Sequence, residues 1–202
     1  MRKIGSLGLM AALVFLAHLV PAAAQQDGAS RPPSPHNETF KKLRAQCEQA
    51  ACAPAGGDAC VEAAVILMGD AAPDEFWHMS SDQRLKISLR LLEKGANNSN
   101  LARAHAYDIY STGGFFAGNS DPYRANELMA MMTASSYPGA ALRKARAIVS
   151  IFSVGATEAE RAGSCELAKS MLAGGRLDAG SRAVAQEILE SNYCAAREPA
   201  KN

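Results

Sequence analysis

The sequence predicts an all-α protein, built as a short α-solenoid of helix–turn–helix repeats. Three observations support this class: apolar residues recur at helical spacing, no stretch alternates β-branched residues with a period of two, and similar helical units return at a near-constant offset. Ala102 and Ala141 open corresponding helices 39 positions apart, and Arg124 and Arg161 correspond at an offset of 37. Repeats of this length are typical of stacked helix pairs, because a single pair cannot bury its own apolar face.

The N-terminal segment 1–24 is expected to be a signal peptide that is cleaved. Arg2 and Lys3 precede an apolar run from Leu7 to Val20, and three alanines at 22–24 offer a small-residue cleavage site. The run is shorter than the ~20 apolar residues of a membrane span, and no later stretch approaches that length, so no span is expected in the mature chain. The alternative is a retained N-terminal anchor.

The charge balance and the cysteine content limit which partners and which location the protein is expected to have. The full chain carries 21 basic and 20 acidic residues, so loss of Arg2 and Lys3 leaves it close to neutral. This balance gives no electrostatic footprint for nucleic acid or an anionic membrane. All five cysteines follow the signal segment, which favours a periplasmic or secreted location where disulfides persist. The odd count leaves at least one cysteine unpaired or available for an intermolecular bond.

The mature chain is expected to have three parts. Residues 25–35, with three prolines, form a disordered leader; residues 36–194 form one helical repeat domain; and residues 195–202 form a fraying tail. Eight or nine helices are expected in the domain, from caps, glycine stops and apolar periodicity. The main ones are predicted over 39–51, 58–68, 80–95, 101–112, 121–135, 141–152, 158–173 and 178–193. A break is predicted over 53–57, Gly95 is expected to stop the third helix, and Asp178 or Ser181 is expected to cap the last one.

The clearest repeat is the segment 101–139. An apolar stripe on its first helix ends at Gly113 and Gly114, and Asp121 then caps a second helix with Pro122 at its first position. The flanking units at 60–95 and 141–175 are weaker copies.

On these residues the unit resembles a Sel-one-like repeat, a relative of the tetratricopeptide repeat. It departs from the family pattern at Tyr107, where the family has glycine, and at Leu128-Met129, which replace an aromatic pair. The resemblance implies a stack of α-hairpins whose first helices line a concave face. The matching residues are Ala102, Ala106, Tyr107, Tyr110, Gly113, Asp121, Arg124, Ala125, Leu128 and Met129.

The resemblance also implies a disulfide. Exported cysteine-rich members of the family bridge the end of one repeat to the start of the next across eight positions, which is the spacing of Cys52 and Cys60. Cys165 and Cys194 are expected to form a second pair, because an antiparallel return brings the last helix back onto its predecessor. Cys47 is then left over, either as a small buried hydrophobe or as a reactive thiol.

The leading functional hypothesis is a protein of the bacterial envelope that binds a protein or peptide partner in the concave face. Arg103, His105, Tyr107 and Tyr110 are the candidate contact residues, because Arg and aromatic side chains dominate such interfaces. Phe115 and Phe116, in the turn that follows, join them if they are exposed. The alternative places the two tyrosines in the core and tucks the phenylalanines between helices.

No catalytic residue, metal or cofactor is predicted. His78 and His105 lack the paired spacing of a zinc helix, and the chain has no Ser-x-x-Lys motif. Two other classes remain open: a cell-envelope enzyme acting on wall peptides or β-lactams, an activity proposed for the cysteine-rich relatives, and an accessory subunit of a secretion or envelope assembly.

Overall fold

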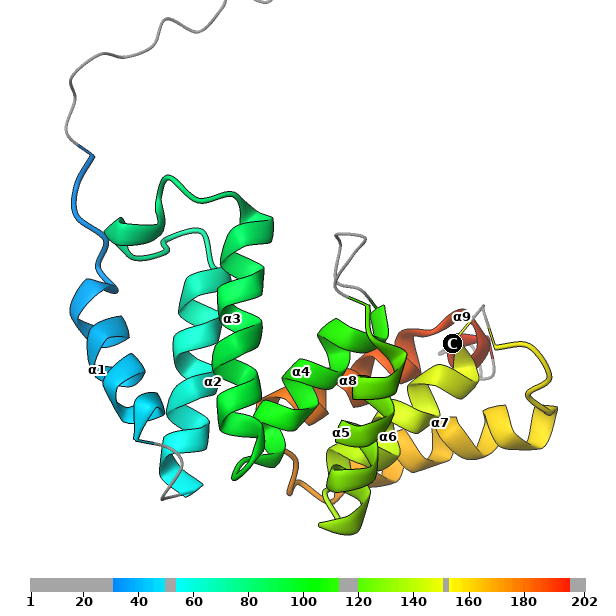
Figure 1. The fold of residues 1–202 in the computed structure, drawn as a ribbon. Helices are drawn as coiled ribbons and strands as arrows, with labels where there is room; N and C mark the ends of the chain where they lie inside the picture. Colours follow the sequence, from blue (N-terminus) through cyan, green and yellow to red (C-terminus); the bar gives the residue numbers. More distant parts are fainter. Residues whose placement is uncertain (1–30, 50–53, 113–119, 151–152, 197–202) are drawn as a thin grey trace, which may run out of the picture. The chain divides into compact units, whose positions relative to one another are not determined.

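The computed structural model describes residues 31–49, 54–112, 120–150 and 153–196 (Figure 1). The predicted signal peptide lies outside these residues. At the end of the predicted leader, Ser34 is buried: its hydroxyl donates to the Ala71 carbonyl at 2.8 Å, and its amide donates to Asp74 Oδ1 at 2.8 Å.

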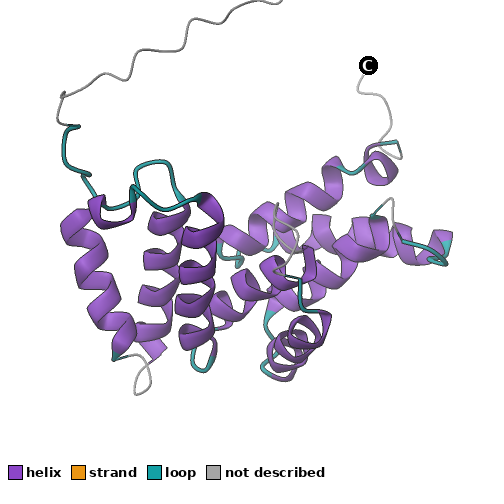
Figure 2. Cartoon of the chain, turned by 45° about the horizontal axis from the view of Figure 1, so that its top comes forward, coloured by secondary structure: helices purple, strands orange, loops and turns teal. Residues whose placement is uncertain are grey.

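Every regular element in the described residues is a helix (Figure 2). The all-α class is confirmed, and none of the described helices is both long and apolar enough to cross a membrane. The elements are α1 (Asn37–Glu48), α2 (Pro54–Met68), the 3-10 turn η2 (Asp74–Phe76), α3 (Ser81–Ala96), α4 (Asn100–Thr112), α5 (Pro122–Ala134), α6 (Pro138–Val149), α7 (Glu158–Ala173), α8 (Ala179–Glu190) and α9 (Asn192–Ala195).

Side-chain caps determine where several helices begin. Ser80 and Thr157 form capping boxes at the starts of α3 and α7. Asp121 accepts from the Arg124 amide with Pro122 at the first position of α5, as predicted. Asp178 accepts from the Ser181 amide at the start of α8, which decides between the two caps considered for that helix.

The core is a series of apolar clusters between helices that follow one another in the chain. Phe40 of α1 meets Phe76 of η2 edge to face, with ring centroids 5.3 Å apart. Leu92 belongs to a second cluster, formed by α2, α3, α4 and α5, while Leu142 and Ile188 belong to a third, formed by α6, α7, α8 and α9. The packing of α2 on α3 and of α4 on α5 is the most extensive.

Two glycines allow α2, α3 and α4 to approach closely. A Cβ on Gly57 would lie 2.6 Å from Ser99 Cβ, and a Cβ on Gly95 would lie 2.9 Å from both Cys60 Cβ and the Gly57 carbonyl oxygen. The break predicted over 53–57 is wrong, because α2 already begins at Pro54, whereas α3 ends at Ala96, one residue after the predicted stop at Gly95. Interhelical contact, rather than turn geometry, requires these glycines.

Gly95→Ala is expected to destabilise the protein. The added methyl group clashes with Cys60 and with the backbone of α2, which costs about 1–3 kcal/mol and outweighs the gain of about 1 kcal/mol in helix propensity. Gly163→Ala is the matched control, because it also lies within a helix but has no atom within 4 Å of the new Cβ. Urea unfolding followed by circular dichroism measures both. Equal stabilisation by the two substitutions would contradict the close-packing explanation.

Two disulfides join helices of the described residues, one between α1 and α2 and one between α7 and α9. Cys165 of α7 pairs with Cys194 of α9, as the sequence suggested, but Cys60 pairs with Cys47 rather than with Cys52. The Cys52–Cys60 prediction was wrong because α1 and α2 pack antiparallel, which brings Cys47 to 4.6 Å from Cys60 between Cα atoms. Cys47 is therefore not left over, and Cys52 lies outside the described residues. Each bond is expected to contribute about 3 kcal/mol through chain entropy.

Candidate functional site

A groove of about 1240 Å³ lies between α4, α6, α7 and the α8–α9 segment. The groove is lined by the end of α4, by α6, by the start of α7 and by the α8–α9 segment; the lining from α6 is called the floor, and the rest is called the walls. Its lining combines two tyrosines with arginine and glutamate side chains. The residues used below are Tyr107, Arg143, Arg146, Ala147, Glu158, Arg161, Glu187, Glu190 and Tyr193.

A buried ion-pair network forms the floor of the groove. The Arg143 side chain of α6 is only 2% exposed, and its Nη2 donates to Asp108 Oδ2 of α4 at 2.5 Å. Arg146 donates from Nη2 to Asp108 Oδ1 at 2.7 Å and from Nη1 to Glu187 Oε2 of α8 at 3.2 Å. Burial opposes the charge of Arg146, but the nearby carboxylates prevail and raise its pKa. Three helices are therefore joined by charges that neutralise one another.

Asp108→Asn is expected to destabilise the protein by about 3 kcal/mol. The substitution leaves the Arg143 guanidinium buried without a carboxylate, and such a charge costs far more than a solvent-exposed pair contributes. Glu166→Gln breaks the exposed pair with Lys169 and serves as the control, with an expected change below about 0.5 kcal/mol. Denaturant unfolding measures both variants. Similar losses for the two would show that the Asp108 network is not a structural requirement.

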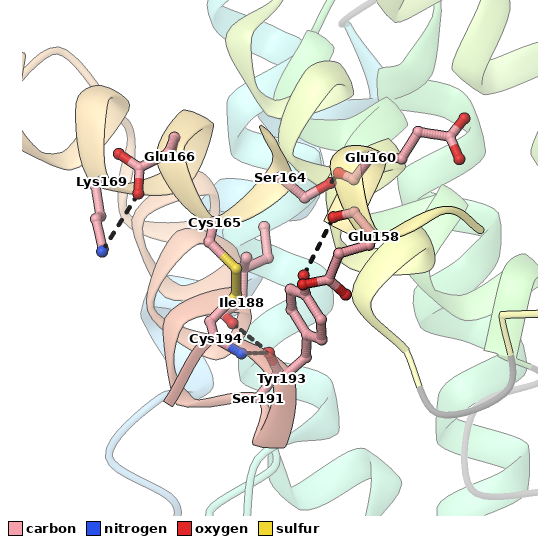
Figure 3. Close-up of a disulfide and its surroundings, with 10 residues drawn as sticks. All are labelled: Glu158, Glu160, Ser164, Cys165, Glu166, Lys169, Ile188, Ser191, Tyr193 and Cys194. Carbon is pink, nitrogen blue, oxygen red and sulfur yellow. Dashed lines mark hydrogen bonds and ion pairs between the residues drawn. A yellow bond between two sulfur atoms is a disulfide. The ribbon is translucent and has the colours of Figure 1, made fainter. Parts of the chain in front are cut away.

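The wall of the groove at α9 is built around Tyr193 (Figure 3). Its hydroxyl donates to the Glu158 carbonyl at 3.1 Å, and the Arg161 guanidinium lies 5.8 Å from the centre of its ring. The neighbouring residue, Cys194, is bonded to Cys165, which lies one turn beyond Arg161 on α7. The disulfide therefore holds the ring of Tyr193 beside Arg161.

Only one of the described candidate contact residues reaches this groove. Tyr107 lines it while also packing partly against the core. Arg103 instead holds the turn between α3 and α4, because its guanidinium donates to the carbonyls of Ala96 at 2.6 Å and Asn97 at 2.8 Å. Phe115 and Phe116 lie outside the described residues.

Tyr110 belongs to a separate polar cluster on α3, α4 and α5. Its hydroxyl shares a hydrogen bond with Glu93, and Glu93 also forms an ion pair with Arg124. Burial, followed by the bond to Glu93, raises the pKa of Tyr110 to about 12. The hydroxyl therefore remains protonated at neutral pH and serves as a fixed donor within the fold.

His105 lies on α4 near the start of α8. Its Nε2 is about 3.9 Å from the point where a Cβ would lie if Gly180 carried a side chain. Burial lowers the pKa of His105 below the ordinary value of 6.5; Asp108 and Asp178 act against this lowering, and Arg143 adds to it. The neutral imidazole is therefore the form that the folded protein prefers.

The stability of the protein is expected to fall between pH 7.5 and 5 because of His105. Its folded pKa is depressed, so its contribution is complete above about 6.5 and is lost as the pH drops through the folded value. His105→Gln should flatten the dependence of the unfolding free energy on pH over this range. Urea titrations at pH 7.5 and pH 5 measure the unfolding free energy of both proteins. An equal change in this free energy between the two pH values, for the variant and the parent, would reject the assignment to His105.

Sequence patterns alone did not indicate most of the residues that form the groove. Asp108, Arg143 and Arg146 form its floor network, and Arg161, Glu190 and Tyr193 belong to its walls. One usable signal was present: Arg143 and Arg146 lie three residues apart on one face of a helix that is otherwise rich in alanine. Nothing comparable marks Arg161 or Tyr193, because their meeting depends on the fold of α7 against α9.

The described residues contain no group of three or more His, Cys, Asp or Glu side chains placed to hold a metal ion. Comparisons with models of known protein families, with curated proteins and with solved structures found no match.

Proposed function

We propose that this chain is an exported helical-repeat protein that binds a segment of a peptide or protein partner in the groove between α4, α6, α7 and α8–α9. The size and lining of the groove carry this proposal. Its volume of about 1240 Å³ is larger than the ~300–1,000 Å³ of most small-molecule sites. Tyrosine and arginine, the side chains that contribute most to protein interfaces, line it together.

The proposal retains Tyr107 from the candidates identified in the sequence and replaces the others with residues of the groove walls. The Sel-one-like repeat type and the location in the bacterial envelope are part of the proposal. Two disulfides are compatible with an oxidising compartment, such as the periplasm or the extracellular space.

A steric block tests the groove. Ala147 is exposed and lines the groove, so Ala147→Trp should fill it without disturbing the core. Peptides are first selected from a random displayed library for binding to the oxidised parent protein. They are expected to bind the Ala147→Trp variant roughly tenfold or more weakly than the parent. Isothermal titration calorimetry gives the affinities of the synthetic peptides.

Ala130→Trp is the matched control, because Ala130 is an exposed helical alanine of α5 that does not line the groove. It should change the affinity less than twofold, and both variants should keep the helical circular dichroism of the parent. Failure of the library to yield any binding peptide would reject the proposal. So would peptides that bind Ala147→Trp as tightly as the parent.

A further inference from the structure

Two opposite charges in the groove have no ion-pair partner among the described residues. Arg161 of α7 forms no ion pair within the described ranges, and its Nη2 donates only to the Ser153 carbonyl, at 3.1 Å. Its Nε is buried without an acceptor. Glu190, the last residue of α8, is exposed and likewise has no ion-pair partner in the part of the chain that the structure describes.

The other charges of the groove are already satisfied. Arg143 and Arg146 are both held by Asp108, and Glu187 is held by Arg146. A ligand would have to displace Asp108 to use the two arginines, and breaking the buried Arg143 pair is costly. Glu187 is exposed but already bonded to Arg146, and Glu158 also has a partner, so Arg161 and Glu190 are the groove charges that a ligand can use without displacing an ion pair of the described residues.

The guanidinium of Arg161 is positioned before any ligand arrives. The ring of Tyr193 supports one side of it, and the hydrogen bond from Tyr193 to the Glu158 carbonyl fixes that ring. The Cys165–Cys194 disulfide restrains the same turn of chain (Figure 3). A planar guanidinium held in this way binds a carboxylate through two parallel hydrogen bonds with little further loss of side-chain entropy.

The glutamates of the lining disfavour a strongly acidic partner. Glu158, Glu187 and Glu190 all line the groove, so a run of carboxylates would meet repulsion beyond the first contact with Arg161. A segment with one carboxylate and one cationic side chain matches both unpaired charges. Such a segment introduces no net charge into a groove that is itself nearly balanced.

We infer that the groove selects a zwitterionic peptide segment, whose carboxylate binds Arg161 and whose Lys or Arg side chain binds Glu190. This inference rests on the proposed function, because it specifies the chemistry of the segment that the groove receives.

The binding of four peptide pools to the oxidised protein tests this inference. Each pool consists of octapeptides with neutral random positions, an amidated C-terminus and a neutral fluorophore on the N-terminus, so only two chosen positions carry charge. These positions, one to five residues apart, hold Asp and Lys, Asp and Gln, Asn and Lys, or Asn and Gln. Fluorescence anisotropy measures the affinity of each pool.

The Asp and Lys pool is expected to bind roughly tenfold tighter than either singly charged pool, since each charge-assisted hydrogen bond contributes about that factor. Arg161→Gln should remove the advantage of Asp over Asn and leave the advantage of Lys over Gln unchanged. Glu190→Gln should do the reverse. Arg182→Gln and Glu62→Gln, which change exposed charges outside the groove, should alter neither preference.

Two outcomes would overturn the inference while leaving the groove as a peptide site. One is equal binding of all four pools, provided that Ala147→Trp still weakens it. The other is an equal loss for every pool in Arg161→Gln, which would show that Arg161 supports the fold through Tyr193 rather than binding a carboxylate. Failure of every pool to bind, together with failure of the library selection, would reject the proposed function itself.

Discussion

The arrangement of the middle helices depends on one buried ion pair, between Arg143 of α6 and Asp108 of α4. A guanidinium that is 2% exposed must keep its carboxylate, because neither water nor another acid in the network can replace it. The same carboxylate holds Arg146, which in turn holds Glu187 on α8. These bonds join α4, α6 and α8 at the groove, in addition to the apolar packing of α6 against α8.

Covalent bonds and close packing complete the framework on both sides of that network. On the N-terminal side, the Cys47–Cys60 disulfide ties α1 to α2, and Gly57 and Gly95 let α2, α3 and α4 approach closely. On the C-terminal side, the Cys165–Cys194 disulfide ties α9 to α7. The second bond also restrains Tyr193, whose ring lies beside Arg161 on the wall of the groove.

The groove therefore separates structural charges from available ones. Charges in its floor are paired across helices and stabilise the fold, whereas Arg161 and Glu190 on its walls retain bonding capacity. The near-neutral net charge, read from composition alone, does not show this division, because the charges that meet in the groove lie on helices far apart in the chain.

The sequence by itself determined the all-α class and the approximate position of most helices, because apolar periodicity and caps such as Asp121 and Asp178 are local signals. It misplaced the start of α2 and did not show that Gly95 admits a neighbouring helix, because a glycine that breaks a helix and a glycine that makes room for another look alike in one dimension. Only the tertiary structure decided that Cys60 pairs with Cys47 and that Arg161 meets Tyr193. These contacts join separate helices, so they depend on how the helices pack rather than on any spacing along the chain.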